Sequence, residues 1–376
     1  MALRVAVIGP LEFPGRQGGM SRHIEEVYAR LAERGHRITV YCHRALAGSE
    51  HRGMRIETVP VIPRSPLDRF SYSMAASVKA ARADVDVVHY HSYANSGWSF
   101  LPRLRGRTVV MTLHRLEWLD EKWGPSGRAV LRANAWITNR SADAFIAVSH
   151  DFEEYARARV PRRSAVVHIP NGVTMPDRIE DDAPAQLGYV PDGFLLAVSR
   201  LVPEKGLDVL LDALDRIAGD GGPSALPVAV AGRARQATPF STALAARAEA
   251  AHPPVRLLGV QPGPVVHGLY RGARALVAPS RREGNPLTVI EAMAHGLCVV
   301  ASDIPPHREL LGDAGILVPV GDAAALADAL RRVSADPAEA HALGARARAR
   351  IEQGGYRWDG VALRTEAALE SAVSGT

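Results

Sequence analysis

The sequence contains only two cysteines, Cys42 and Cys298, which lie in different halves of the chain. They form neither a CxxC nor a zinc-type pattern, which argues against a disulfide framework and against a structural metal site. Lysine is also scarce, because Lys79, Lys122 and Lys205 are the only ones among 45 basic residues. We expect both thiols to be reduced and buried, and we draw no functional conclusion from the preference for arginine.

Long hydrophobic runs are missing as well. No window reaches the roughly 18 apolar residues of a membrane span, and the first residues lack the layout of a signal peptide, so we expect a cytoplasmic protein. The formal net charge is +5, with the basic excess in residues 1–190. Because the basic residues are scattered without interleaved aromatics, nucleic acid is not an expected partner. An anionic acceptor, or peripheral contact with the inner face of a membrane, is left open.

Short apolar runs alternate with helical patterns along the whole chain. The first such unit is an apolar strand at 4–8, a Gly/Pro-rich loop to Gly19 and a helix that Gly35 ends. Continuous apolar strands separated by helices are typical of a parallel sheet covered on both faces. The expected strands are 4–8, 38–42, 85–88, 108–113, 144–148, 166–169, 194–199, 228–231, 255–259, 275–279 and 298–301.

This alternation restarts after a segment rich in Asp, Pro and Gly. It predicts an α/β protein of two doubly wound Rossmann-like domains that face each other across a cleft, with ligands at the carboxyl ends of the strands. The predicted limits are an N-terminal domain at 1–175, a linker at 176–190, a C-terminal domain at 191–355 and a terminal helix at 356–376. We expect that helix to return toward the N-terminal domain, with Trp358, Ala362 and Leu369 as anchors.

Three loops carry residues suited to anion binding. The first joins the first strand to the first helix and contains Gly15, Gly18 and Gly19, where the backbone can approach an anion at a helix N-terminus. It is not a GxGxxG motif, which argues against a nicotinamide dehydrogenase. An ordinary glycine-rich turn is the alternative interpretation.

The second loop, residues 199–206, follows the first strand of the second domain and reads SRLVPEKG. Arg200 and Lys205 would therefore lie at the carboxyl end of a strand, where two cations can neutralise a diphosphate. The alternative is a solvated loop in which Glu204 pairs with Lys205.

The third loop, residues 281–288, reads RREGNPLT and precedes a helix. Asn285 is a good N-cap and Pro286 a good first helical residue, so the helix N-terminus would face the ligand. Glu283 could accept hydrogen bonds from hydroxyl groups, and Glu291 could reach a ribose. The alternatives are an ordinary capped helix and, for Glu291, a surface carboxylate.

Glu283 and Glu291, within SRREGNPLTVIEAMAHGLCVVASD, resemble the paired-glutamate motif of retaining glycosyltransferases of family 4, which have the GT-B fold. The resemblance extends over most of the chain and includes GGMSRHIEEVYARLAERGHRITVY, SADAFIAVSH, IPNGV and SRLVPEKGLDVLLDAL. A narrower likeness, in TLHRLEWLDEKWG, is to bacterial rhamnosyltransferase-like members. Several stretches in the same order make the family resemblance more specific than any one loop.

The resemblance assigns roles by position. It implies that Arg200 and Lys205 bind the donor diphosphate, that Glu283 contacts sugar hydroxyls and that Glu291 holds the ribose. It further implies that backbone N–H groups of Leu287 and Thr288 bind phosphate, that Gly18 and Gly19 border the donor phosphate or the acceptor, and that His114 contacts the transferring sugar. Where related sequences often have glycine after this histidine, this chain has Arg115, so its acceptor side is expected to be specialised.

Other residues remain acceptor-side candidates or decoys. Trp118 is expected either to line the acceptor site or simply to pack. His89 and His91 end one strand and could bind the acceptor, but no third ligand is evident for a zinc site. Asp84-Val-Asp86 imitates the DxD motif of metal-dependent transferases but lies at the wrong end of that strand, and we reject it.

We therefore predict a retaining glycosyltransferase that uses a nucleoside-diphosphate sugar and a hydroxyl acceptor and needs no cofactor or essential metal. The acceptor could be a polysaccharide, a lipid-linked intermediate or a natural product. A nucleotide-sugar epimerase of the same architecture and a non-catalytic sugar-nucleotide-binding protein are the alternatives.

Overall fold

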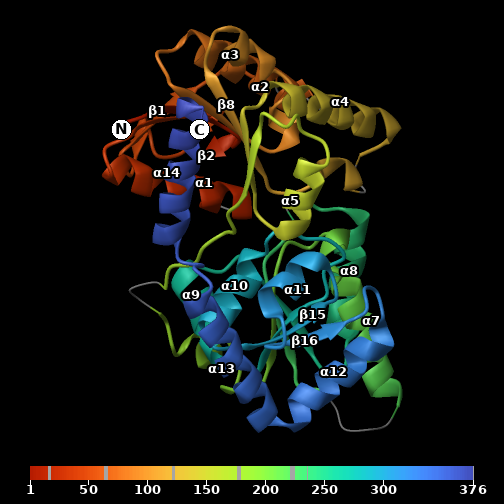
Figure 1. Cartoon of the computed structure of the whole chain (residues 1–376). Helices are drawn as coiled ribbons and strands as arrows, with labels where there is room; N and C mark the ends of the chain where they lie inside the picture. Colours follow the sequence, from red (N-terminus) through yellow and green to blue (C-terminus); the bar gives the residue numbers. More distant parts are fainter. Residues whose placement is uncertain are drawn as a thin grey trace. The chain divides into compact units, whose positions relative to one another are not determined.

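The computed structural model describes residues 1–15, 18–62, 67–120, 123–175, 179–220, 225–234 and 236–375. The chain forms two compact units (Figure 1). Unit 1 comprises Met1–Gly172 and Arg357–Thr376, and unit 2 comprises Val173–Tyr356. None of the helices described is both long and apolar enough to cross a membrane.

Unit 1 is an α/β structure whose last helix comes from the end of the chain. Its elements are β1 (Arg4–Ile8), β2 (Glu12–Phe13), α1 (Gly19–Glu33), β3 (Arg37–Cys42), β4 (Arg44–Ala45), β5 (Glu50–His51), β6 (Met54–Thr58), α2 (Leu67–Arg82), β7 (Val87–His91), η1 (Tyr93–Asn95), α3 (Phe100–Leu104), β8 (Thr108–Leu113), η2 (Glu117–Leu119), α4 (Pro125–Ser141), β9 (Ala144–Ala147), α5 (His150–Arg157), β10 (Ala165–His168) and α14 (Trp358–Ser374).

Unit 2 repeats the alternation of strands and helices. Its elements are α6 (Ala183–Gln186), β11 (Leu195–Val198), η3 (Pro203–Lys205), α7 (Leu207–Gly219), β12 (Val228–Ala231), α8 (Pro239–Ala250), β13 (Val255–Gly259), α9 (Gly263–Gly272), β14 (Ala275–Ala278), α10 (Leu287–Ala294), β15 (Cys298–Ser302), α11 (Pro305–Leu311), β16 (Ile316–Val318), α12 (Ala323–Ala335) and α13 (Pro337–Gln353).

Each unit contains one large twisted sheet. The strand order is β10-β9-β8-β7-β1-β3-β6-β5 in unit 1 and β13-β12-β11-β14-β15-β16 in unit 2. All pairs in these sheets are parallel except β5 with β6. In both units the first long strand lies inside the sheet, and the chain extends the sheet first on one side of it and then on the other. This is the doubly wound order, with switch points at β1/β7 and β11/β14.

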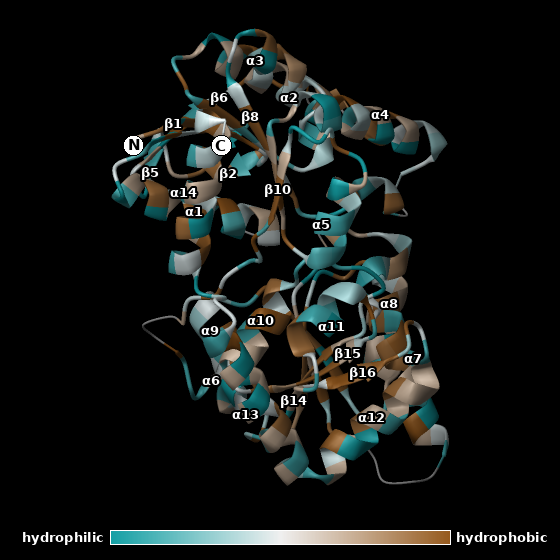
Figure 2. Ribbon diagram, in the orientation of Figure 1, coloured by the Kyte–Doolittle hydropathy of each residue, from teal (hydrophilic) through white to brown (hydrophobic). Residues whose placement is uncertain are grey.

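Both faces of the unit 2 sheet are buried, as its apolar strands require. Leu195 and Ala197 of β11 pack into one hydrophobic cluster, while the intervening Leu196 packs into another on the opposite face. Helices α7, α8 and α12 contribute to the first cluster, α9, α10 and α11 contribute to the second, and α13 contributes to both. Figure 2 shows the strands of this sheet as mainly hydrophobic between these helices.

The last helix, α14, packs on α1 within unit 1. Its predicted anchors Trp358, Ala362 and Leu369 are all buried. Salt bridges from Arg30 to Asp359 and from Arg34 to Glu366, both at 2.6 Å, add polar contacts along the same junction.

The linker predicted at 176–190 lies inside the limits of unit 2, which begins at Val173. Ala183 and Pro184 of α6 are buried there, and residues 176–178 lie outside the described part of the chain. Both cysteines are buried free thiols, as expected, and burial raises the pKa of Cys42 to about 11 and that of Cys298 to about 12.

Candidate active site

The switch point of unit 2 brings two predicted loops together. The loop after β11 carries Lys205, and the loop after β14 carries Glu283. These two strands are neighbours in the sheet, and the chain leaves them in opposite directions. In a doubly wound sheet the connections that follow these two strands pass to opposite faces, which leaves a crevice at the strand ends where ligands bind.

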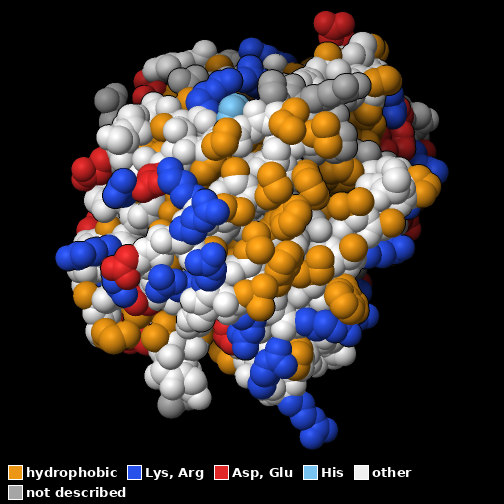
Figure 3. All heavy atoms as spheres, turned by 90° about the horizontal axis from the view of Figure 1, so that it is seen from above, with side chains coloured by type: hydrophobic (Ala, Val, Ile, Leu, Met, Phe, Trp, Pro, Cys, Tyr) orange, Lys and Arg blue, Asp and Glu red, His pale blue; other side chains and the backbone are white. Residues whose placement is uncertain are grey.

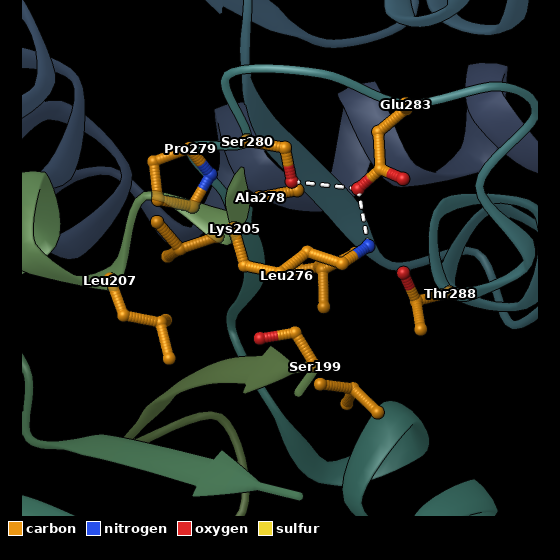
Figure 4. A pocket seen from close by; sticks show the side chains of 11 residues that line it. Ser199, Lys205, Leu207, Leu276, Ala278, Pro279, Ser280, Glu283 and Thr288 are labelled. Carbon is orange, nitrogen blue, oxygen red and sulfur yellow. Dashed lines mark hydrogen bonds and ion pairs between the residues drawn. The ribbon is translucent and has the colours of Figure 1, made fainter. Parts of the chain in front are cut away.

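A small pocket at this position is shown in Figure 4. The ammonium group of Lys205 donates a hydrogen bond to Oε1 of Glu283 at 2.5 Å, and the Ser280 hydroxyl donates to the same oxygen at 2.7 Å. The lining residues are Val198, Ser199, Lys205, Leu207, Leu276, Val277, Ala278, Pro279, Ser280, Glu283 and Thr288. The pocket therefore has mainly apolar walls and one partly buried ion pair.

The charge state of Glu283 follows from its neighbours. Burial alone would raise the pKa of this carboxyl, but the positive charge of Lys205 and the hydrogen bonds from Lys205 and Ser280 hold it below its usual value. Glu283 is thus ionised at neutral pH. The alternative in which Lys205 pairs with Glu204 is not what the structure shows, because Lys205 pairs with Glu283.

Gly206 fixes the position of Lys205. It has a φ of +67°, and a Cβ atom at this position would lie 1.9 Å from the carbonyl oxygen of Pro279. Only glycine allows this close approach between the two loops. Arg281 ties the loop after β14 to the first turn of α7, because its guanidinium donates to both carboxylate oxygens of Asp208, at 2.8 and 2.6 Å.

The helix after Glu283 starts later than the sequence predicts. The N-cap position of α10 is Pro286, with no side-chain cap, and Leu287 is the first helical residue. The prediction of Asn285 as N-cap and Pro286 as first helical residue is therefore wrong by one position. Pro286 itself has extended backbone angles, with φ of −74° and ψ of 110°, so the helix begins only at the next residue. Leu287 and Thr288 still provide the N–H groups of the first turn.

Glu291 lies within α10 and is buried, which excludes the surface-carboxylate alternative. The hydroxyl of Tyr270 donates a hydrogen bond to its Oε2 at 3.0 Å. Arg200, the other predicted diphosphate ligand, is exposed in the loop after β11. Arg200 and Glu291 thus both lie in unit 2, the first in the predicted loop and the second in the predicted helix.

His307 is a residue of this site that the sequence analysis missed. It is fully buried in α11, and its Nδ1 donates to the carbonyl oxygen of Ser302 at 2.7 Å. Within the described residues, its Nε2 has no hydrogen-bond partner. Burial lowers the pKa of this imidazole, although the charge of Glu283 acts in the opposite direction. The position of His307, just beyond the carboxyl end of β15, was the signal available in the sequence.

In unit 1, His89, His91 and His114 form a hydrogen-bonded chain through Tyr28. The Tyr28 hydroxyl lies 2.6 Å from Nδ1 of His89 and 3.0 Å from Nε2 of His91. Nδ1 of His91 lies 2.9 Å from Nε2 of His114, and Nε2 of His89 lies 2.7 Å from the Thr112 hydroxyl. The histidines predicted separately are therefore parts of one network.

The prediction that no third ligand lies near His89 and His91 is wrong, because the structure brings His23 and His114 next to His91. A nitrogen atom from each of His23, His91 and His114 lies within 4.8 Å of the other two. His23 comes from α1 and shares a 2.9 Å hydrogen bond with Asn171. No sequence signal connects residues so far apart in the chain.

Burial keeps these imidazoles neutral. It lowers the pKa of His23 to about 4 and, with a smaller effect from the charge of His23, that of His89 to about 3. The pKa values of His91 and His114 also lie well below the usual value for the same reason. Neutral imidazoles can act as hydrogen-bond donors and acceptors to a sugar hydroxyl.

The other predicted residues of unit 1 have mixed surroundings. Gly18 is exposed at the N-cap of α1 with a φ of +105°, and Gly19 begins that helix, whereas Arg16 and Gln17 lie outside the described residues. Arg115 is half-exposed and pairs with Asp120 at 2.7 Å. Trp118 is buried against Tyr93, with ring centroids 5.5 Å apart, which agrees with the packing alternative.

Glu117 is a second residue that the sequence analysis missed. It is buried in η2, and its Oε1 accepts a hydrogen bond from the Ser92 hydroxyl. Burial raises the pKa of this carboxyl, although Arg115 acts against the rise. Its Oε2 has no partner in the described part of the chain, so a buried polar atom is available close to the carboxyl end of β7.

The rejected DxD decoy has a structural role. Arg4 forms ion pairs with both Asp84 and Asp86, and its pair with Asp86 measures 2.6 Å. Both aspartates precede β7, away from the edge that carries His91.

Comparison with known families gives matches in both units. A model described as "Glycosyltransferase Family 4" matches residues 17–175, and one described as "Glycosyl transferases group 1" matches residues 193–336. The chain is a family 4 glycosyltransferase. The two matches include most of the predicted motifs, from Gly18 to Glu291.

Two bacterial relatives align with this glycosyltransferase over nearly the whole chain. It is 29% identical to D-inositol 3-phosphate glycosyltransferase 1 of Catenulispora acidiphila, over 99% of this chain and 96% of that protein. It is 27% identical to phosphatidyl-myo-inositol mannosyltransferase of Mycolicibacterium smegmatis, over 99% and 95%.

Solved structures establish the fold. Sucrose-phosphate synthase of Thermosynechococcus elongatus aligns with a TM-score of 0.81 at 22% identity and 100% coverage of both chains. Anabaena Alr3699/HepE in complex with UDP-glucose aligns with a TM-score of 0.80 at 20% identity, over 98% of this chain and 100% of that one. The two Rossmann-like units of this glycosyltransferase therefore have the GT-B fold.

Proposed function

We propose that this glycosyltransferase moves a sugar from a nucleoside-diphosphate donor to a hydroxyl acceptor, with retention of configuration and without a metal ion. The observation that carries the proposal is the pairing of Lys205 with Glu283 at the switch point of unit 2. A cation beside an ionised carboxylate suits a ligand with a phosphate next to a sugar, because the cation can bind the phosphate and the carboxylate the hydroxyls.

In this proposal the donor is held mainly by unit 2. Lys205 and Arg200 neutralise the diphosphate, and the backbone N–H groups of Leu287 and Thr288 bind its oxygens at the start of α10. Glu283 accepts hydrogen bonds from the sugar hydroxyls, and Glu291 accepts them from the ribose. When the phosphate binds Lys205, Glu283 loses part of its present ion pair and becomes free to bind the sugar.

The proposed reaction needs no protein nucleophile. The bond between the anomeric carbon and the diphosphate oxygen breaks, and the acceptor oxygen attacks the same face of an oxocarbenium-like centre. The proton of the acceptor hydroxyl passes to an oxygen of the leaving phosphate. Cations and N–H groups stabilise the departing diphosphate, which is the part of the reaction where charge develops most.

Unit 1 is proposed to supply the acceptor side, through His114 and its partners. His114 contacts the transferring sugar, Gly18 and Gly19 border the donor phosphate or the acceptor, and Arg115 binds an anionic group of the acceptor. The names of the inositol-phosphate relatives make inositol phosphates the first acceptors to test, and the UDP-glucose complex of the Anabaena protein makes UDP sugars the first donors.

A thermal-shift screen against nucleoside diphosphates and nucleotide sugars tests donor binding, because a ligand that binds only the folded state raises the melting temperature. We expect a shift with one nucleotide base and none with the free nucleoside. A flat response to every nucleotide would contradict the donor site.

Transfer itself is tested with the donor found in that screen and candidate acceptors, with the product anomer read by NMR. We expect the anomeric configuration of the donor to be kept and EDTA to have no effect. An inverted product would refute retention, and activity lost in EDTA and restored by a metal would refute metal independence. Isomerised donor in the absence of acceptor would identify an epimerase instead.

A further inference from the structure

Three histidines of unit 1 converge from different elements of the fold. His23 lies in α1, His91 ends β7 and His114 follows β8. One nitrogen atom of each ring lies within 4.8 Å of the corresponding atoms of the other two, and the group contains only imidazoles. Imidazole nitrogens are the ligands that zinc and the neighbouring late transition metals bind in proteins, whereas magnesium and calcium prefer oxygen.

The three rings have the spacing of ligands around one metal ion. Their centroids are 5.6 Å apart for His23 and His91, 4.9 Å for His23 and His114, and 5.2 Å for His91 and His114. A tetrahedral zinc ion with Zn–N bonds of about 2.0–2.1 Å holds each imidazole centre about 3.2 Å away, which puts the centres about 5.2 Å from one another. The rings are therefore already spaced as in a zinc site.

The nitrogen atoms of two of these rings point at each other. Nδ1 of His91 lies 2.9 Å from Nε2 of His114, with one shared proton between them. Two nitrogen ligands of a tetrahedral zinc ion lie about 3.3 Å apart. A metal ion that replaces the shared proton thus requires these nitrogens to separate by only about 0.4 Å.

Neighbouring groups hold the other nitrogens of the ligand rings. Nδ1 of His23 lies 2.9 Å from the amide oxygen of Asn171, which only accepts hydrogen bonds, so the lone pair of His23 is on Nε2. Nε2 of His91 lies 3.0 Å from the Tyr28 hydroxyl, which can accept its proton and leave the lone pair on Nδ1. Zinc-binding histidines usually donate their second N–H to such a partner, which fixes the ring and its tautomer.

Zinc binding at this point needs no net loss of a proton. The proton on Nε2 of His114 moves to Nδ1 of the same ring, and the ligands are then Nε2 of His23, Nδ1 of His91 and Nε2 of His114. His23 and His91 are buried, whereas His114 is only partly buried, so an ion can enter on the side of His114. Three neutral imidazoles with the fourth position left to water are an established set of zinc ligands.

We propose that His23, His91 and His114 bind one zinc ion, and that the bound ion inhibits the enzyme. The metal site itself is independent of the substrates. The inhibition rests on the proposed function, because the ion occupies the ring nitrogen of His114 and fixes its tautomer at the place where His114 is proposed to contact the sugar. The enzyme is active without the metal, so EDTA protects activity and does not remove it.

Binding is measured on the full-length protein, freed of metal, without donor or acceptor. Zinc is added in competition with a chromophoric zinc indicator, and we expect one ion per chain with a Kd of about 10 µM or lower. Cobalt(II) in the same site should show the intense visible absorption of a four-coordinate ion. Absence of zinc binding, or the weak spectrum of six-coordinate cobalt, would overturn the proposal.

Substitutions locate the ion. His23→Gln and His114→Gln each remove one ligand and should weaken zinc binding at least tenfold. Tyr28→Phe keeps all three ligands but removes the partner of His91, and should weaken binding about tenfold. Each variant is checked for an unchanged melting temperature in EDTA, so that loss of folding is not mistaken for loss of a ligand.

His150→Gln is the matched control, because His150 is an exposed histidine of unit 1 with a second imidazole nearby. Its ring centroid lies 3.9 Å from that of His168. Among the described side chains on the face that Figure 3 shows, histidine is scarce, so this surface offers zinc few competing ligands. Zinc binding that is lost in His150→Gln and kept in His23→Gln would place the ion elsewhere and refute the assignment.

Inhibition is tested with the donor and acceptor found for transfer. Zinc at about ten times its Kd should reduce the initial rate at least fivefold, EDTA should restore it, and the rate of His23→Gln should not respond to zinc. Zinc binding without any change in rate would refute the inhibition. Transfer by a protein that does not bind zinc would refute the metal site alone, whereas zinc binding by a protein that transfers no sugar would refute the proposed function alone.

Discussion

Nδ1 of His91 lies 2.9 Å from Nε2 of His114, and the two rings stack at the carboxyl ends of neighbouring strands β7 and β8. A neutral imidazole has one donor and one acceptor nitrogen, so the chain from Thr112 through His89, Tyr28 and His91 to His114 can be satisfied in only two directions. In one direction Nδ1 of His114 is an acceptor, and in the other it is a donor. The direction of the hydrogen bonds in this buried chain therefore determines whether Nδ1 of His114 is a donor or an acceptor.

We predict that Tyr28→Phe reduces kcat about tenfold or more while the KM for donor changes less. The substitution keeps the buried ring and removes only the hydroxyl that connects His89 with His91. It should also lower the free energy of unfolding by about 1–3 kcal/mol, because two buried nitrogen atoms lose their partner. Steady-state kinetics and urea unfolding measure the two effects.

Tyr90→Phe is the control for this prediction. Tyr90 lies on the same strand as His89 and His91, is equally buried, and donates its hydroxyl to Ser77 at 2.8 Å, outside the histidine chain. It should lose stability with little change in kcat. Equal losses of kcat in the two variants would show that the chain does not act through His114.

Stability should fall as the pH is lowered below about 6.5, because the buried histidines are neutral in the folded protein. Burial lowers the pKa of His23 to about 4, so between about pH 6.5 and 4 the unfolded chain binds one more proton at this residue. The free energy of unfolding then decreases by about 1.4 kcal/mol for each pH unit, from His23 alone. His89, with a pKa of about 3, adds an effect of the same sign.

Urea unfolding at pH 7 and pH 5, followed by a spectroscopic signal from unit 1, measures this effect. His23→Gln should reduce the pH dependence by about one proton, whereas His43→Gln, which changes an exposed histidine, should leave it unchanged. The same slope for the His23→Gln variant and the unmodified protein would mean that His23 is already protonated in the folded state.

Glu283→Gln should reduce transfer about 100-fold or more while nucleoside-diphosphate affinity changes by less than about fivefold. The amide keeps the volume of the side chain, but it removes the negative charge that pairs with Lys205 and that is proposed to accept hydrogen bonds from the sugar hydroxyls. Glu204→Gln, in the neighbouring loop, is the matched control and should affect neither quantity strongly. Equal losses of transfer and affinity for Glu283→Gln would contradict a role at the sugar. Calorimetry measures the nucleoside-diphosphate affinity, and initial rates measure sugar transfer.

Gly206→Ala should destabilise unit 2 by about 2 kcal/mol or more and weaken nucleotide binding, because its new methyl group would overlap the carbonyl oxygen of Pro279. Gly219→Ala, at the other end of α7, has open space around the added methyl group and should be neutral or slightly stabilising. Thermal unfolding with and without nucleotide measures both. A Gly206→Ala protein that keeps full affinity would show that the two loops can separate without moving Lys205.

Much of the fold could be predicted because the central strands are buried on both faces. The limits of β1, β8, β12 and β13 agree with the apolar runs, whose ends are marked by charged or turn residues. Strand β7 was predicted too early, at 85–88, because His89, Tyr90 and His91 lack the apolar character of a buried strand. Their polar atoms are bonded to one another inside unit 1, which a sequence cannot display.

The candidate site was predictable where a loop follows a strand. Lys205 and Glu283 each lie a few residues after a central strand, so the doubly wound order alone places them together. The start of α10 was missed by one residue because Asn285 and Pro286 fit two overlapping capping patterns. His23 was missed because its partner Asn171 lies far away in the chain. His307 was missed although its position shortly after β15 was visible in the sequence.

Helix α14 gives unit 1 an unusual order of completion during protein synthesis. The ribosome makes all of unit 2 before residues 357–376, so α1 and the nearby His23, whose ring centroid lies 5.7 Å from that of Trp358, lack their cover until translation is almost finished. Domains that are contiguous in sequence can fold one after the other as they emerge. Here the first half of the chain to be made is the last to be completed, and His23 acquires its final surroundings only when α14 has been synthesised.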